Sequence, residues 1–334
     1  MNMMIKKILL TLSLCSSSYT FADCTVSSNA VISLGTLSSI AFSENGLART
    51  QFNSGLACNS FSVALIDITY IKYRAEQFST VLTNSVNNDS LSVIFRDKNG
   101  NVIQQGLDVD LSSLTILSLF SGPSNSIPFT VEASSGQVVS PGTYTLTLPF
   151  RVTWYYSVPA LAILGLGAFY ESPGFQRPGL ISSINWGSGK SSTTTLKLTI
   201  DSDCRITTND VNFGTAAFST DFQPVNTSLD IRCSSKTPYS VGLSNGENYA
   251  VNAQRAMKSG NNYLQYELYK NTSQYRWGSA GAERWSSAEA SSNAGIYNGT
   301  TQQVYNFSSI ILGTNTTTLP AGVYTDNVTV DVTF

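Results

Sequence analysis

Short stretches in which apolar and polar side chains alternate recur along the whole chain. Val328, Val330, Val332 and Phe334 alternate with polar residues, as expected of a half-buried β-strand. Residues 264–268 repeat this alternation. No long window shows the 3.6-residue period of an amphipathic helix together with helix caps. The pattern therefore predicts an all-β protein.

Turn signals separate these stretches at regular intervals. Asn99-Gly100 lies between residues 91–96 and 101–104, and Asn-Gly is the strongest short-range signal for a β-hairpin. Charged residues make up only 12% of the chain, and Ser, Thr, Asn and Gly take their place. Short strands joined by such turns predict immunoglobulin-like β-sandwich domains.

The chain contains a diverged internal repeat. Residues 24–35 resemble residues 204–214, and each segment begins with a cysteine. Further on, residues 141–148 resemble residues 320–330, and each segment contains a tyrosine that lies 120 positions after the cysteine. Together with the length, this repeat predicts two sandwich domains in tandem, at residues 23–200 and 201–334.

The two halves differ after that tyrosine. The first half continues for 56 residues beyond Tyr144 and includes a fresh strand at residues 196–200, whereas ten residues follow Tyr324. We therefore expect the second sandwich to lack its last strand. The terminal strand, with Val328, Val330, Val332 and Phe334, would then flank an open hydrophobic groove with unpaired backbone groups. Another polypeptide would have to supply the missing strand.

Residues 1–22 have the three parts of a secretory signal peptide: two lysines, a short apolar core and small residues before Asp23. Cleavage there would remove Cys15 and leave four cysteines, an even number in an exported chain. Their spacing favours the disulfides Cys24–Cys58 and Cys204–Cys233.

Charge and composition exclude several functions. Without the two leader lysines, 17 basic residues face 21 acidic ones, a net charge of −4, which argues against binding nucleic acid. The chain has no histidine, so catalysis by Ser-His or Cys-His pairs and histidine-ligated metal sites are excluded. The longest apolar run, residues 158–170, is too short and too interrupted to span a bilayer. We expect no cofactor and no metal.

A set of motifs in the second half resembles the spore coat protein U domain family, the pilin module of archaic chaperone–usher pili. The motifs cover about 130 residues and are specific only as a group. They are the Cys204 to Gly214 start, Cys233 with Pro238-Tyr239, Arg255-Ala-Met257, residues 263–269, Trp277-Gly278 and Pro320 to Phe334. The two-domain plan is similar to the tip adhesins of Csu-type pili.

This resemblance implies donor-strand complementation, in which each pilin lacks its last strand and receives one from the N-terminal extension of the next subunit. It also implies a periplasmic chaperone that fills the groove first, and an outer-membrane usher. A shaft subunit needs a donor extension before its first cysteine, but here only Asp23 precedes Cys24. We therefore expect a non-enzymatic subunit that is exported through the periplasm and ends a pilus, where it mediates attachment and biofilm formation.

The tail of the first half provides the candidate binding surface. We expect the apolar run 158–170 to form a long exposed loop that contacts abiotic hydrophobic surfaces or a host ligand. Its candidate contact residues are Leu161, Ile163, Leu164, Leu166, Phe169 and Tyr170. A second possible binding loop contains Leu114, Ile116, Leu117, Leu119 and Phe120. Burial of either run in the core is the alternative.

Other functions remain open. A lectin-type tip could stack sugars on Trp154, Tyr155, Tyr156 and Trp186. A structural minor pilin would require a donor extension, which we do not find. A hydrolase would require two carboxylates brought together. Asp108 and Asp110 form an Asp-x-Asp pattern, but the sequence offers no further calcium ligands.

Overall fold

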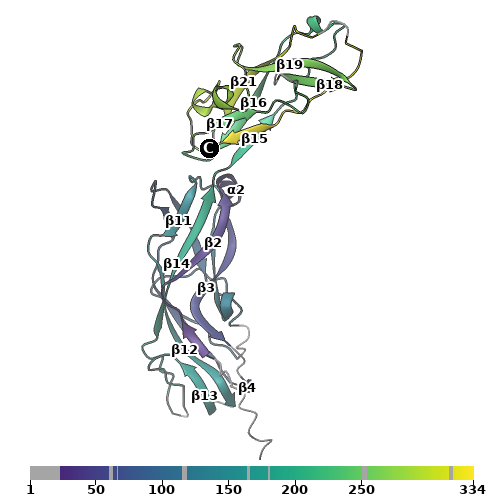
Figure 1. Cartoon of the computed structure of the whole chain (residues 1–334). Helices are drawn as coiled ribbons and strands as arrows, with labels where there is room; N and C mark the ends of the chain where they lie inside the picture. Colours follow the sequence, from purple (N-terminus) through teal and green to yellow (C-terminus); the bar gives the residue numbers. More distant parts are fainter. Residues whose placement is uncertain are drawn as a thin grey trace, which may run out of the picture.

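The computed structural model describes residues 23–59, 63–65, 67–114, 119–163, 166–179, 181–249, 254–315 and 319–334. Almost every described element is a strand, and the strands form two sandwiches in tandem (Figure 1). Strands β1–β14 build two sheets, and strands β15–β22 build another two. The predicted leader lies outside the described residues.

The first half combines a four-stranded sheet, in the order β1-β3-β10-β8, with a larger sheet, in the order β7-β6-β11-β14-β12-β5-β9. Strands β13 and β4 pair with β12, and β2 pairs with β14. The bounds are β1 Asp23–Val26, β2 Ala30–Ser38, α2 Ser39–Asn45, β3 Leu47–Asn59, β4 Val63–Leu65, β5 Tyr70–Gln77, β6 Val81–Asn84, β7 Ser90–Ser92, β8 Ile94–Arg96, β9 Asp108–Asp110, η2 Pro123–Asn125, β10 Ser126–Ala133, β11 Gly142–Leu146, β12 Phe150–Ile163, β13 Leu166–Glu171 and β14 Lys190–Asp201.

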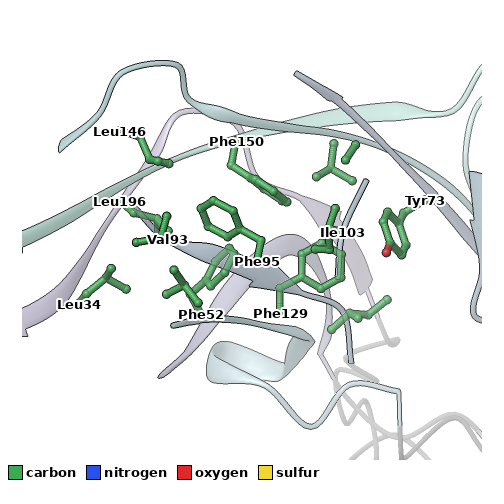
Figure 2. Packing of buried hydrophobic residues seen from close by; sticks show 14 of the residues in the cluster. Leu34, Phe52, Tyr73, Val93, Phe95, Ile103, Phe129, Leu146, Phe150 and Leu196 are labelled. Atoms are coloured by element: carbon green, nitrogen blue, oxygen red, sulfur yellow. The ribbon is translucent and has the colours of Figure 1, made fainter. Parts of the chain in front are cut away.

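Aromatic rings fill the space between these two sheets (Figure 2). Phe52 of β3 makes edge-to-face contacts with Phe95, Phe129 and Phe150, whose ring centroids lie 5.8–6.2 Å away. All four rings are at most 1% exposed. Edge-to-face pairs of this kind each contribute about 0.5–1.5 kcal/mol beyond the burial of their area. The first half therefore has a closed aromatic core.

Strand β14 completes this core from within the same half. It runs antiparallel to β12 and β11, with Thr194 opposite Phe150 and Leu198 opposite Tyr144, and parallel to β2. Alternate side chains of β14, from Ser192 to Ile200, are buried. The strand expected at residues 196–200 is thus present and closes the sandwich.

The second half combines a five-stranded sheet, in the order β15-β16-β21-β19-β18, with a three-stranded sheet, in the order β20-β17-β22. The bounds are β15 Cys204–Thr208, η3 Ser219–Asp221, β16 Val225–Cys233, β17 Ser240–Leu243, β18 Arg255–Ser259, β19 Asn262–Lys270, η4 Gly281–Glu283, β20 Trp285–Ser286, η5 Ser287–Glu289, β21 Gln303–Ile311 and β22 Val330–Thr333. A separate hydrophobic cluster around Trp277 and Tyr305 fills this half.

Both disulfides form between the cysteines that the spacing selects, Cys24 with Cys58 and Cys204 with Cys233. Each joins the first strand of its half to a neighbouring strand. The Asn99-Gly100 turn is present, and the Gly100 backbone N–H donates to the Asp97 carbonyl. However, the two segments on either side of this turn pair through a single antiparallel bridge, between Arg96 and Val102.

The alternation expected in β19 fails at one residue. Glu267 is only 4% exposed, because it forms ion pairs with Arg276 and with Arg255, which is fully buried. Arg255 also donates to the backbone carbonyls of Ser244, Leu243 and Trp277, at 2.7–2.9 Å. Desolvation by burial lowers the pKa of Arg255, and the Glu267 carboxylate opposes this shift. One arginine thus joins β17, β18 and β19.

Polar contacts connect the two halves where β14 leads into β15. Glu44, in the last turn of α2, accepts hydrogen bonds from Arg205 at 2.9 Å and Arg232 at 2.8 Å. Asp89 forms an ion pair with Lys236, and the buried Ser39 hydroxyl lies 2.5 Å from that of Ser234. We call this set of contacts the joint. It holds the second half against the α2 end of the first.

Replacing Arg255 with leucine leaves Glu267 without its buried partner. Arg276 still pairs with Glu267, but the buried carboxylate loses one of its two cations and three backbone carbonyls lose their donor, so we expect the change to destabilise the second half by about 3–5 kcal/mol. The control is Arg49→Leu, which removes a pair with Glu132 from an arginine that is 52% exposed, and which we expect to cost at most about 1 kcal/mol. Denaturant unfolding followed by tryptophan fluorescence measures both, and equal effects would contradict this role of Arg255.

Acid should loosen the joint. The hydrogen bond from Arg205 lowers the pKa of Glu44, with help from Arg232. Glu44 therefore supports the joint fully above its ordinary pKa of 4.5, and this support is lost as the pH falls below that value. We expect Glu44→Gln to broaden the distance distribution between spin labels on the two halves at pH 7, and acid to broaden it in the wild type. Glu132→Gln, a change within the first half, serves as the control, and an unchanged distribution in Glu44→Gln would contradict the role of this carboxylate.

Candidate functional site: an open groove and an apolar distal end

Equivalent positions of the repeat allow the two halves to be compared residue by residue. Cys24 and Cys204 are 180 positions apart, and so are Tyr144 and Tyr324. Each tyrosine hydroxyl donates to the carbonyl four residues before it, Tyr144 to Ser140 at 2.7 Å and Tyr324 to Pro320 at 2.9 Å. The same tyrosine corner therefore occurs at the equivalent position of both halves.

Burial at this corner differs sharply. Tyr144, Phe150, Val152 and Trp154 are each completely buried in the first half. Their counterparts 180 positions later are Tyr324, Val330, Val332 and Phe334; the first three are half-buried and Phe334 is 53% exposed. The first half covers these positions with β14. In the second half β17 pairs with β22 on one side, and among the described residues no strand pairs with the other edge of β22.

A groove of about 480 Å³ lies at this uncovered position. One wall continues from the end of β15 through residues 208–211 and Phe213, and the other comprises residues 324–328 and Val330 of β22. In the first half, the two segments 180 positions before these walls lie on either side of β14. Apolar side chains form the floor, namely Leu229, Leu243, Met257, Leu268, Trp277 and Phe307. The groove therefore combines an apolar floor with largely polar walls, at the position that β14 occupies in the first half.

One end of the groove is polar. The Tyr266 hydroxyl donates to Asp326 Oδ2 at 2.7 Å, and Asp326 Oδ1 accepts from the Glu247 backbone at 2.9 Å. Burial raises the pKa of Tyr266 strongly, and its hydrogen bond to Asp326 raises it further. Tyr266 therefore stays a neutral donor at physiological pH, and this contact ties β19 to the segment before β22.

The apolar run 158–170 is not the long loop that we expected. Val158 to Ile163 lie in β12, and Leu166 to Tyr170 lie in β13, which pairs with β12 as a hairpin. Strand β4 pairs with β12 from residue 161 to 163. The hairpin lies at the end of the first half that is farthest from the second (Figure 1).

The expected contact residues of the hairpin lie in different environments. Leu166 is 80% exposed, and Phe169 and Tyr170 are half-buried. Leu164 and the side chains of Leu161 and Ile163 lie outside the described part of the structure. Val158 and Ala162 are buried, so one face of the hairpin packs inward. Leu166 is therefore the expected residue with the clearest access to solvent.

The residues of the second expected loop also differ in their exposure to solvent. Leu114 is 70% exposed, and Phe120 is half-buried. Leu119 is fully buried in the core of the first half, so the expectation that it contacts a ligand is wrong for this conformation. Ile116 and Leu117 lie outside the described residues. The bridge between Thr69 and Ser113 places Leu114 beside the start of β5.

Sequence reasoning missed two exposed isoleucines at the same end. Ile181 is fully exposed, and Ile68 is 39% exposed. The turn signal Pro178-Gly179 just before Ile181 could have indicated an exposed apolar residue there. We call Ile68, Leu114, Leu166 and Ile181 the distal apolar set.

The other candidate sites receive no support. Trp154 and Tyr156 belong to the core and cannot stack on a sugar. Tyr155 and Trp186 share the Lys72 ammonium, which lies 4.6 Å from the centre of the Tyr155 ring and 5.0 Å from that of Trp186. Asp108, the first residue of the Asp-x-Asp pattern, is paired with Lys72 and Arg74. No group of three or more metal-ligating side chains occurs in the described ranges, and none of their helices is long and apolar enough to span a membrane.

Comparisons with known proteins agree with this architecture. Residues 190–331 match the Spore Coat Protein U domain family. The chain resembles a chain in the crystal structure of the CsuC–CsuE chaperone–tip adhesion subunit pre-assembly complex from archaic chaperone–usher Csu pili of Acinetobacter baumannii. The two are 47% identical, the match covers 93% of this chain and 100% of the other, and the TM-score is 0.77. No curated protein sequence matches the chain significantly.

Two further solved structures show a much weaker likeness. One is a chaperone–tip adhesin complex of CFA/I fimbriae (10% identity, 92% of this chain, 96% of the other, TM-score 0.29), and the other is a mutant of the CFA/I adhesin CfaE of enterotoxigenic E. coli (9%, 91%, 92%, TM-score 0.27). At these scores they carry no argument. The match with the Csu complex and the family domain at residues 190–331 show that the chain belongs to the structural, non-enzymatic tip-adhesin family of archaic chaperone–usher pili.

Proposed function

We propose that residues 201–334 form a pilin domain that accepts a donor strand, and that residues 23–200 form the adhesive domain of a pilus tip. The observation that carries this proposal is the difference between the two halves. β14 fills one sandwich, and a groove with an apolar floor lies at the corresponding position of the other. Exposed strand edges and apolar floors are where an added strand gains both hydrogen bonds and burial.

The partners follow from this groove. A periplasmic chaperone would cover the groove after export, and the N-terminal strand of the adjacent pilin would replace it at an outer-membrane usher. The similar structure from A. baumannii is itself a complex of a chaperone with a tip subunit. The groove is flanked by β22 and by the segment after β15, so the incoming strand would lie between them as β14 lies between its neighbours. The assembled pilus would then carry this chain on the cell surface.

The adhesive contact would be made by the distal apolar set together with the outer face of the β12–β13 hairpin. Leu114, Leu166 and Ile181 are each at least 70% exposed. Burial of one large apolar side chain contributes at most about 1.5–3 kcal/mol, so a single tip would hold a hydrophobic surface weakly. Many pili per cell would multiply the attachment through avidity and support biofilm formation.

A charge placed in the groove should block pilus incorporation. Val328 is half-buried and lines the groove, whereas the neighbouring Thr329 is exposed. We expect Val328→Glu to abolish recovery of the chain in surface pili. An apolar donor strand in the groove would bury the new carboxylate without a partner, and burial of an unpaired charge is costly. The control Thr329→Glu should be recovered at wild-type levels. Immunoblots of sheared pili measure both, and normal incorporation of Val328→Glu would contradict the assignment of the groove.

Loss of one exposed leucine should weaken attachment to hydrophobic surfaces. We expect Leu166→Thr to lower the attachment of piliated cells to polystyrene several-fold, with little effect on hydrophilic glass, because the variant presents less apolar area. The control is Val86→Thr, which changes an apolar residue near the joint that is 90% exposed, compared with 80% for Leu166. Pilus amounts must be equal. Unchanged attachment by Leu166→Thr and by a combined Leu114→Thr, Leu166→Thr, Ile181→Thr variant would contradict hydrophobic adhesion.

A further inference from the structure

A single arginine lies where four segments meet beneath the β12–β13 hairpin. Arg177 belongs to the segment that follows β13, and its side chain is 16% exposed. Its guanidinium forms an ion pair with Asp67 and donates to the Ile68 carbonyl at 2.8 Å. It also donates to Ser157 Oγ of β12, at 2.8 Å. Arg177 thus joins its own segment to β12 and to the chain that leads into β5.

The same guanidinium contacts aromatic rings of both flanking strands. Its central carbon lies 3.9 Å from the centre of the Phe169 ring of β13 and 4.9 Å from that of Tyr70 of β5. A planar guanidinium can stack on a ring while its edge keeps its hydrogen bonds, which an ammonium group cannot do. The ring of Phe169, a candidate contact residue, is therefore held from within the molecule.

The partners of Arg177 are themselves fixed. Asp67 is 7% exposed and Ser157 is fully buried. The Ser157 hydroxyl donates onward to Glu171 Oε1 at 2.8 Å, and Glu171 is paired with Ser157 across the hairpin. The hydrogen bonds of Arg177 therefore reach the base of both hairpin strands through residues that have little freedom to move.

We propose that Arg177 is a positioning residue for adhesion: it fixes the β12–β13 hairpin on the sandwich so that Leu166 is presented outward. This inference rests on the proposed adhesive role of the hairpin. A hairpin already ordered in its binding conformation loses less conformational entropy when it meets a surface, so adhesion becomes stronger without any new contact. Arg177 would act through Phe169 and Ser157 and would not itself touch the surface.

The test compares three variants of the full chain. Arg177→Lys keeps the charge but loses the planar stack and the forked hydrogen bonds. Arg151→Lys, at an exposed position of the same strand β12, is the matched control. Leu166→Thr reports whether the hairpin takes part in adhesion. Each variant is examined for hydrogen exchange of residues 157–171 in its chaperone complex, for melting temperature, and for attachment of equally piliated cells to alkyl-coated glass.

We expect Arg177→Lys to speed amide exchange in the hairpin about tenfold, because the lost contacts hold the hairpin against the chain that leads into β5. We expect its attachment to fall several-fold and its melting temperature to stay within about 3 °C of the wild type. Arg151→Lys should match the wild type. A fall in melting temperature with faster exchange throughout the first half would overturn the positioning role in favour of general stability.

Two further outcomes separate this inference from the proposed function. If Arg177→Lys keeps normal attachment while Leu166→Thr loses it, the hairpin is adhesive but Arg177 does not position it, and the inference is wrong. If neither variant loses attachment, the hairpin is not the adhesive element, and the proposed function of the distal end fails together with the inference.

Discussion

A β-sandwich that lacks one strand leaves core side chains and backbone hydrogen-bonding groups open to water. Both halves of the molecule are subject to this constraint. In the first half β14 meets it, and Tyr144, Phe150 and Trp154 are completely buried beneath the closed sheets. In the second half the equivalent position is a groove, and the equivalent side chains remain partly open to solvent. We therefore propose that the first half can fold alone and carry the binding surface, and that the second half is completed by a partner.

The contacts between the halves would transmit a pulling force from the distal end of the first half to the second half. Glu44 engages two arginines of the second half, and the Ser39–Ser234 contact is buried at the point where β14 leads into β15. The hairpin lies at the opposite end of the first half (Figure 1). Force applied to the distal end would thus pass along the long strands β12 and β14 to the joint, and then into the domain that we propose is held by the pilus.

Sequence patterns predicted the features that depend on repetition. The spacing of Cys24, Cys58, Cys204 and Cys233 gave the disulfides, and the unequal lengths after Tyr144 and Tyr324 indicated the extra strand of the first half. Features that depend on contacts between distant segments were missed. The burial of Glu267 follows from Arg255, and the burial of Leu119 depends on how its segment packs on the core. The run 158–170 is apolar on both faces, so its pattern could not distinguish a loop from a hairpin.

Hydrogen exchange at the two tyrosine corners tests the central claim most directly. Amides of residues 322–333 and of residues 142–153 should be compared in the chain alone and in its complex with the pilus chaperone. We predict that residues 142–153 are equally protected in both samples, because β14 covers them, and that residues 322–333, where β22 pairs with β17 alone, gain protection in the complex. Equal and strong protection of both segments in the free chain would show that the second sandwich is already closed, and would contradict the account.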